Sequence, residues 1–238
     1  GIPVVIGETH PQTSLIFSGI ANEKGSPVVF ADLLFNTGLG LQSLDARQVF
    51  NVRKGREVVY ENLRLGLLGQ YQSKNICTVL AAVDGLRRKG WDIPDQSLRS
   101  GLEKVVENTG LAGRWQVIGA NPRIICDTGH NVGGIREVVA QLQQVPYKTL
   151  HFVIGMVNDK DIMGVLALLP RDAIYYFTKA NIPRALDETK LMKTAAHFKL
   201  YGSTYPSVKE AIAAAKQNSL PEDLIFIGGS TFVVAEAI

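Results

Sequence analysis

Residues 123–131 read Arg-Ile-Ile-Cys-Asp-Thr-Gly-His-Asn, a short apolar run that leads into a polar turn. The apolar part, from Arg123 to Cys126, predicts a buried strand, because β-branched residues favour strands and a parallel strand is covered on both faces. A helical pattern of apolar residues follows at about residues 132–144. The stretch therefore predicts one strand–turn–helix unit of an α/β sheet.

The alternation of strand and helix continues to the end of the chain. Further strands are predicted at Leu150–Ile154, Ala173–Phe177, Phe198–Tyr201 and Leu224–Ile227, and helices near residues 160–169, 187–196 and 206–217. Strands joined by crossover helices form a mostly parallel sheet covered on both faces. We therefore expect an α/β, doubly wound, Rossmann-like domain. The breaker cluster Asn108-Thr109-Gly110 predicts that this domain occupies residues 111–238.

Residues 1–110 follow a different pattern of short strands and then helices. The predicted elements are strands at Pro3–Ile6 and Pro27–Ala31, a hairpin over Gln48–Tyr60 that turns at Lys54-Gly55, and helices at Gly69–Lys89 and from Pro94 to about Glu107. The chain begins with Gly1 in strand-like sequence, and its first methionine is Met156. We therefore expect it to be a piece of a longer polypeptide.

The composition is that of an ordinary globular protein, with 46% hydrophobic and 20% charged residues. A net charge of +3 gives no focused basic surface, so we expect no nucleic-acid partner. No apolar run approaches the roughly 20 residues that cross a bilayer, so we expect no membrane partner. Cys77 and Cys126 lie in apolar runs and predict reduced core thiols of a cytoplasmic protein. We also expect a monomer.

Polar residues that follow strands are the candidates for a site, because ligands bind beyond the carboxyl ends of parallel strands. Asp127 and His130 follow one strand, and Gly228-Gly229-Ser230-Thr231 follows the last one. Gly155 to Asp161 follows a third strand. Such turns can bind anions, but each also has a purely structural interpretation in which Asp127, Asn131, Ser230 or Thr231 caps the next helix. The sequence contains no Gly-x-x-x-x-Gly-Lys-Ser/Thr phosphate loop.

Five motifs together resemble folylpolyglutamate synthase/dihydrofolate synthase of the Mur ligase superfamily. They are Leu67-Leu68-Gly69-Gln70-Tyr71-Gln72-Ser73-Lys74-Asn75, Gly113-Arg114-Trp115, Asp127-x-x-His130-Asn131, Gly155 with Asp159-Lys160-Asp161, and Gly229-Ser230. Their order and spacing match the family over nearly the whole chain. The first two motifs are the most specific ones.

The resemblance implies an ATP-dependent ligase. Such an enzyme phosphorylates the carboxylate of dihydropteroate or of a folate, and the amino group of L-glutamate then attacks the acyl phosphate to form an amide. The resemblance also implies a central ATPase domain with the phosphate loop, the magnesium (Mg²⁺) ligands and a modifiable lysine, all upstream of Gly1. Residues 1–110 would be the rear part of that domain, and thus an incomplete α/β domain, and no metal ligand is expected in this chain.

The family's functional positions map onto five residues of this sequence. Asn75, Arg114 and Asp127 match positions that contact ATP. His130 matches a position near phosphate or the incoming glutamate, and Ser230 matches one that is associated with glutamate binding. Arg114, Asp127 and His130 would be the catalytic ones, because a guanidinium neutralises phosphoryl charge and an imidazole can bind an anion or orient an amine. Gly129 and Val132 stand where the family often has alanine and proline.

Two other functions fit the same motifs. One is another Mur-type amino-acid ligase, which acts on a cell-wall precursor. The other is a non-catalytic nucleotide-binding module that kept the Rossmann-like domain. As a fragment of a folate-type ligase that carries no phosphate loop of its own, the chain is expected to be inactive alone.

Overall fold

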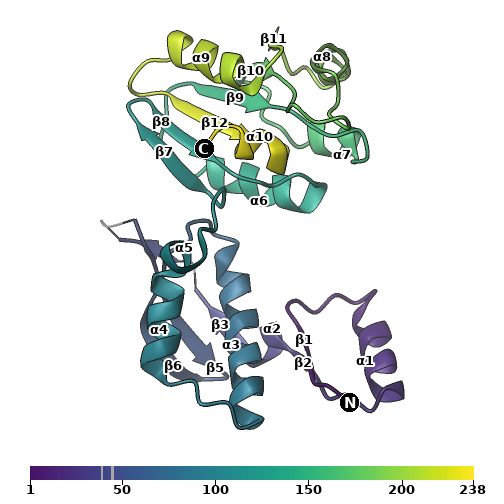
Figure 1. Cartoon of the computed structure of the whole chain (residues 1–238), viewed down its shortest axis with the longest axis vertical. Coiled ribbons are helices and arrows are strands. Elements are labelled where there is room, and N and C mark those ends of the chain that lie inside the picture. The colour runs from purple at the N-terminus through teal and green to yellow at the C-terminus, as the bar shows by residue number, and fades with distance from the viewer. Residues whose placement is uncertain (39, 44–45) are drawn as a thin grey trace. The chain divides into compact units, whose positions relative to one another are not determined.

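The computed structural model describes residues 1–38, 40–43 and 46–238 of the chain. By their contacts these residues divide into two compact units, Gly1–Leu111 and Ala112–Ile238 (Figure 1). Each unit has its own apolar core. The two units are therefore described separately.

The first unit combines a small parallel sheet with an antiparallel one. Its strands are β1 (Val4–Ile6), β2 (Val28–Phe30), β3 (Phe35–Thr37), β4 (Leu41–Gln42), β5 (Gln48–Lys54) and β6 (Glu57–Leu65). Its helices are α1 (Ser14–Glu23), α2 (Ala31–Leu34), α3 (Gln72–Arg88), α4 (Asp95–Glu103) and α5 (Val105–Thr109). Strands β1 and β2 pair in parallel, and β5 pairs antiparallel with β3, β4 and β6.

Most of the predicted elements of this unit are confirmed. The hairpin of β5 and β6 turns at Gly55, whose φ of +61° favours glycine. Helix α3 buries Ile76 and Leu80 against the antiparallel sheet, as its apolar spacing predicts. The second predicted helix is interrupted at Lys104, where α4 ends and α5 begins. Helix α1 was not among the predicted elements.

The second unit is a six-stranded α/β sheet in the order β11-β10-β9-β12-β8-β7. Its strands are β7 (Gln116–Ala120), β8 (Arg123–Cys126), β9 (Leu150–Ile154), β10 (Ile174–Phe177), β11 (Gly202–Thr204) and β12 (Leu224–Gly228). Its helices are α6 (Val132–Leu142), α7 (Ile162–Leu166), α8 (Glu188–Ala196), α9 (Val208–Asn218) and α10 (Thr231–Ala235). Only β7 pairs antiparallel, with β8. The predicted α/β fold class with a mostly parallel sheet is confirmed.

Helices cover both faces of this sheet, and Figure 1 shows α6 and α9 on opposite sides of it. On the α9 side, Ala211 and Ala215 pack with Ile225 and Ile227 of the central strand β12. The side chains of β12 are buried along its whole length. Burial on both faces explains why the predicted strands of this unit are continuous apolar runs.

The predicted strand at Phe198–Tyr201 is wrong. These residues end α8 in a Schellman motif, in which the Leu200 N–H donates to Ala195 O at 3.2 Å and Lys199 adopts a left-handed φ of +63°. Leu200 is buried as the apolar contact of that motif. The strand itself, β11, begins at Gly202, where a Cβ would lie 1.8 Å from Tyr175 O. Strand β7 was also not predicted.

The predicted core thiols are confirmed, because Cys77 and Cys126 are both free and buried. Burial raises the pKa of each thiol to about 11, and nearby Asp127 contributes to the shift at Cys126. Within the described part of the chain, no helix is both long enough and apolar enough to span a bilayer.

Candidate active site

The turn after β8 lies at the carboxyl edge of the sheet, beside the turns that follow β12 and β9. These three strands are adjacent, and a Cβ added to Gly228 would lie 3.1 Å from Asp127 O. A Cβ added to Gly229 would lie 2.9 Å from Gly155 O. Glycine at these positions therefore allows the three turns to approach one another closely.

Asp127 is buried and both of its carboxylate oxygens accept main-chain hydrogen bonds. Asp127 directly follows β8, and the residue is only 2% exposed. Oδ2 accepts from the N–H of Trp115 at 2.8 Å, and Oδ1 accepts from the N–H of Gly129 at 2.7 Å. A charged acceptor strengthens such bonds. Asp127 thereby ties the Gly113-Arg114-Trp115 segment to the turn after β8.

The segment held by Asp127 has an unusual backbone. Trp115 is buried and has φ of +47°, a left-handed conformation that costs energy for a bulky residue. Gly113 has φ of +75°, and a Cβ there would lie 2.8 Å from Val234 Cγ1. The family resemblance singled out this segment, but the sequence did not reveal its backbone conformation. Arg114 is therefore flanked by two residues with left-handed backbone conformations.

Thr128 contacts the same segment. Its N–H donates to Gly113 O at 2.9 Å. Its hydroxyl accepts a hydrogen bond from Nη1 of Arg114. Thr128 is 7% exposed and Arg114 is an exposed residue, so this contact is partly buried. The guanidinium of Arg114 is thus fixed beside the turn that contains Asp127 and His130.

His130 is oriented by the same turn. Its Nδ1 lies 2.9 Å from Thr128 O. Because a carbonyl oxygen can only accept, Nδ1 carries the hydrogen, and in the neutral imidazole the lone pair is on Nε2. The half-buried ring can therefore accept a proton or a hydrogen bond at Nε2, or donate from it when protonated.

The helix-capping interpretation is correct for two of these turns. Asn131 is the N-cap of α6, and its side chain accepts from Gly134 N at 2.8 Å. Ser230 is the N-cap of α10, and its hydroxyl accepts from Phe232 N at 3.2 Å. Ser230 is 2% exposed. A capping hydroxyl can still donate its own hydrogen, so capping does not exclude a ligand contact.

The loop after β9 is also explained by capping and ion pairing. Asp161 caps α7 by accepting from Gly164 N at 2.9 Å. Asp159 forms an exposed ion pair with Arg184 at 3.3 Å, and Arg184 lies over the ring of Phe232, 4.9 Å from its centroid. This loop therefore has structural contacts for both of its aspartates.

The structure brings together Arg114, Asp127 and His130, and it places Ser230 after the neighbouring strand. Asn75 belongs to the other unit. It is exposed in the first turn of α3, where its Nδ2 donates to Gln72 Oε1 at 2.9 Å. In the ranges 1–38, 40–43 and 46–238, no three His, Cys, Asp or Glu side chains are grouped as a metal site requires.

A second polar cluster, which the sequence did not reveal, is buried at the opposite edge of the sheet. His151 lies 2.9 Å from Tyr176 Oη and 3.4 Å from Asp223 Oδ2. Burial opposes ionisation of Asp223, but hydrogen bonds from Leu220 N–H and from His151 outweigh it and lower the pKa of this carboxyl. The cluster joins β9, β10 and the start of β12.

Comparison with known proteins defines the class of this chain. Residues 113–231 match the family model described as Mur ligase, glutamate ligase domain. That match covers half of the chain and includes the Arg114, Asp127, His130 and Ser230 positions. The chain belongs to the Mur ligase family.

Within this family the chain is similar to enzymes of folate metabolism, which confirms the resemblance. It is 28% identical over 238 residues to the dihydrofolate synthase/folylpolyglutamate synthase of Escherichia coli, covering 99% of this chain and 51% of that protein. It also matches the structure of E. coli FolC in complex with DHPP and ADP, with a TM-score of 0.78, 26% identity, and coverage of 99% and 52%.

The folylpolyglutamate synthase of Mycobacterium tuberculosis, solved with ADP and AMPPCP, has the same fold at a TM-score of 0.82. Its identity is 23%, over 98% of this chain and 53% of that one. The chain thus spans about half the length of these relatives.

Proposed function

We propose that this chain is the C-terminal part of an ATP-dependent ligase that adds L-glutamate to dihydropteroate, to folylpolyglutamate or to both. In this reaction ATP converts the acceptor carboxylate into an acyl phosphate, and the glutamate amine displaces the phosphate to form an amide. The observation that carries the proposal is the attachment of Arg114 to the Asp127–His130 turn, within a chain whose relatives catalyse this reaction.

The proposed roles follow from the chemistry of each group. Arg114 offers a fixed cation to the phosphates of ATP and to the charge that develops during phosphoryl transfer. Nε2 of His130 faces the incoming glutamate and orients its amine. Ser230 contacts glutamate through its hydroxyl, and Asn75 binds the nucleotide. Asp127 supports the ATP site mainly by holding the main chain next to Arg114.

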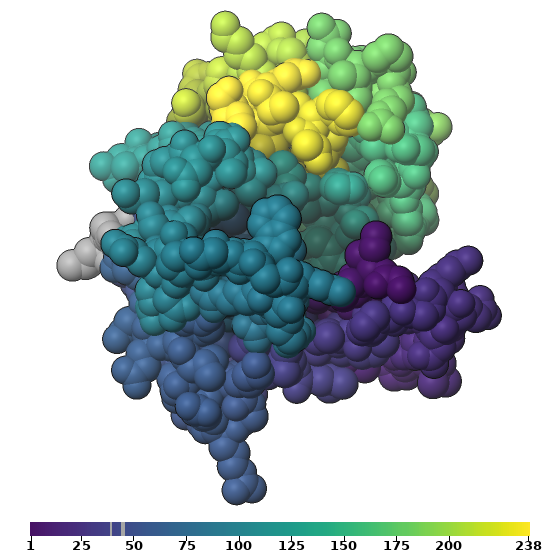
Figure 2. Space-filling view, turned by 60° about the horizontal axis from the view of Figure 1, so that its bottom comes forward, coloured from purple at the N-terminus to yellow at the C-terminus, as the bar shows by residue number. Residues whose placement is uncertain are grey.

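We also propose that Gly1–Leu111 is the rear part of a central ATPase domain and that Ala112–Ile238 belongs to the C-terminal Rossmann-like domain. Support comes from the apolar side chains that the first unit exposes. Leu15 is 81% exposed, Ile16 57% and Ile2 83%, around a parallel sheet of only two strands. Figure 2 shows this N-terminal region, in purple, at the surface. A patch of this kind usually marks a covered surface.

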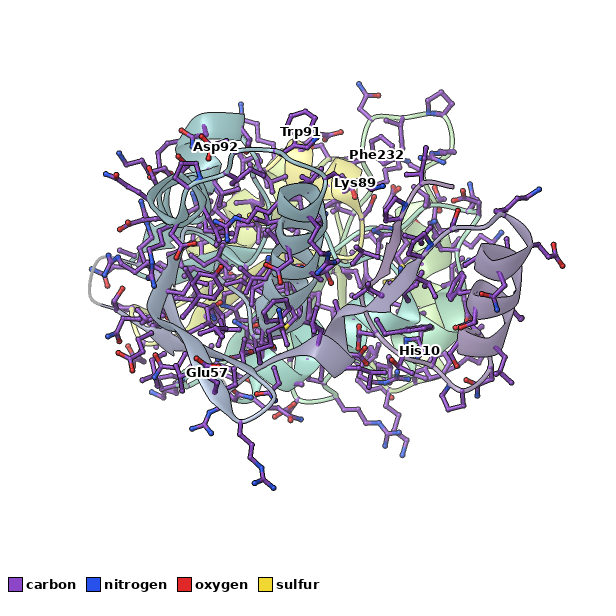
Figure 3. The ribbon with its side chains drawn as sticks, turned by 90° about the horizontal axis from the view of Figure 1, so that it is seen from below. His10, Glu57, Lys89, Trp91, Asp92 and Phe232 are labelled. Carbon is purple, nitrogen blue, oxygen red and sulfur yellow. The ribbon has the colours of Figure 1, made fainter. Side chains whose placement is uncertain are left out.

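A groove of about 540 Å³ lies between Ile2 and the end of α3. Its lining includes Ile2, Val5, Leu86 and Trp91. Trp91 is 65% exposed and lies with Lys89 in the segment that follows α3 (Figure 3). We infer that the remaining half of the ligase covers these side chains and supplies the phosphate loop.

The remaining half also supplies the Mg²⁺ ligands in this proposal, because the residues described in this chain do not form a cluster that fits a metal ion. When bound, magnesium neutralises phosphate charge. No role in holding it is assigned to this chain. We place the enzyme in the cytoplasm, which is consistent with two free thiols, and we propose that it is a monomer.

The test is glutamate-dependent ADP release by the complete polypeptide. With ATP, magnesium and L-glutamate present, dihydropteroate or a folate should stimulate ADP release, and mass spectrometry should show a product one glutamyl residue heavier. Stimulation by a nucleotide-linked cell-wall precursor instead would identify the other type of Mur ligase. Nucleotide binding without any ADP release would identify a non-catalytic module.

A further inference from the structure

Thr128 contacts the Arg114 segment through three different groups. Its N–H donates to Gly113 O, its hydroxyl accepts from Arg114 Nη1, and its methyl group lies 2.9 Å from where a Cβ of Gly113 would be. Its carbonyl oxygen also accepts from His130. One residue therefore contacts both of the side chains proposed to meet the reacting groups.

We propose that Thr128 is a positioning residue, whose hydroxyl holds the Arg114 guanidinium in the orientation that phosphoryl transfer requires. The inference rests on the proposed function. An arginine side chain has several rotatable bonds, and holding it in advance reduces the entropy lost when an anion binds. The hydroxyl accepts one hydrogen bond from Nη1, and the N–H groups on the other guanidinium nitrogens can then donate to a phosphate.

The neutrality of this partner supports the proposal. Four other arginines form ion pairs with carboxylates, namely Arg47 with Glu107, Arg64 with Glu103, Arg87 with Asp95 and Arg184 with Asp159, whereas Arg99 donates to the carbonyl oxygen of Glu61. A carboxylate partner offsets the positive charge that attracts phosphate. A hydroxyl fixes the guanidinium without offsetting its charge. The positive charge of Arg114 therefore stays available to an anion.

The test compares Thr128→Val with Thr128→Ser in the complete ligase. Valine keeps the shape and removes the hydroxyl, whereas serine keeps the hydroxyl. We expect Thr128→Val to lower kcat/KM for ATP about tenfold, the effect of losing a hydrogen bond to a charged group, with the KM for glutamate unchanged. Thr128→Ser should stay within about twofold of the unaltered enzyme.

The matched control is Thr178→Val. Thr178 follows β10, is fully buried, and its hydroxyl has no hydrogen-bond partner among the residues that the structure describes, so the same substitution removes no such bond. Its rate should be unchanged. A second control uses Arg114→Ala, in which Thr128→Val should cause no further loss, because Thr128 is proposed to act only through Arg114. If valine at position 128 disturbs folding, Thr128→Ala replaces it in the same comparisons.

Two results would overturn the inference in an active enzyme. One is equal kcat/KM for ATP in the valine and serine variants. The other is a further tenfold loss when Thr128→Val is added to Arg114→Ala. If the complete protein shows no ADP release that depends on glutamate and acceptor, the proposed function itself is refuted, and the role of Thr128 is refuted with it.

Discussion

The main-chain N–H of Trp115 donates to Asp127 Oδ2 at 2.8 Å, while Trp115 itself has φ of +47°. A left-handed φ at a tryptophan costs of order 1–3 kcal/mol and persists only where surrounding contacts enforce it. The carboxylate of Asp127 provides one such contact, and burial of the indole ring provides another. The conformation of the Arg114 segment therefore depends on a side chain 12 residues further along the chain.

Asp127→Asn should destabilise the protein. The amide keeps one acceptor and turns an NH₂ group towards a main-chain N–H, so one of the two bonds is lost. We expect a loss of about 1–3 kcal/mol in the free energy of unfolding, measured by urea denaturation of the complete protein. The control is Asp159→Asn, which removes an exposed ion pair and should change the stability by less than about 0.5 kcal/mol. Equal effects of the two substitutions would show that the hydrogen bonds to Asp127 do not stabilise the fold.

Substitution of Arg114 or His130 should impair ligation in the complete enzyme. Arg114→Ala or His130→Ala removes a charged or polar contact of about 1.5–3 kcal/mol and should lower the rate at least roughly tenfold. Arg114→Lys should recover little, because a lysine cannot reproduce the planar guanidinium. Steady-state ADP release with saturating acceptor measures the effect. Unchanged rates would remove these residues from the site.

The chain of residues 1–238 alone should not turn over ATP. Its sequence contains no Gly-x-x-x-x-Gly-Lys-Ser/Thr loop to hold the β- and γ-phosphates. The assay is ADP release with glutamate and a pteroate or folate acceptor, with the complete ligase as the positive control. Acceptor-dependent ADP release by the isolated chain would show that a phosphate-binding site has been overlooked.

The apolar surface of the first unit should bind a hydrophobic dye in the isolated chain but not in the complete ligase. The exposed residues Leu15, Ile16 and Trp91 offer binding sites that the rest of the ligase is proposed to cover. Fluorescence of 1-anilinonaphthalene-8-sulfonate measures the difference. Leu15→Lys together with Ile16→Lys should lower the dye signal of the isolated chain. Equal fluorescence of the isolated chain and the complete ligase would argue against the proposed covering half.

The buried Asp223 should make stability depend on acidity. Its pKa is lowered in the folded protein, so its contribution is fully present above the unfolded value of about 3.9 and is lost as the pH falls through the folded value. Asp223→Asn should therefore lower the free energy of unfolding at pH 7 by about 1–3 kcal/mol and flatten its decline below about pH 4. Urea denaturation at a series of pH values provides the measurement.

The sequence predicted those parts of the fold that depend on apolar periodicity. The strand at Leu224–Ile227 and the helix over Gly69–Lys89 are clear because burial requires apolar side chains at regular spacing. Edge strand β7 was missed because its partly exposed side chains give a weaker pattern. The strand assigned at Phe198–Tyr201 failed because the apolar contact of a helix end resembles the start of a strand.

The candidate site could be predicted only in part from the sequence. The position of Asp127 and His130 after a strand could be predicted, because parallel sheets place their ligand sites there. The bond between Arg114 and Thr128 joins residues 14 positions apart through a left-handed backbone. No local pattern encodes such a contact, so it required the folded structure.

The two sequestered cysteines make this protein convenient for site-specific labelling. A thiol with a pKa of about 11 has very little thiolate at neutral pH, and burial also blocks reagents from Cys77 and Cys126. A cysteine introduced at an exposed position such as Lys209 would then be the only fast-reacting thiol within residues 1–238. A fluorophore attached there could report on ligand binding without removal of either native cysteine.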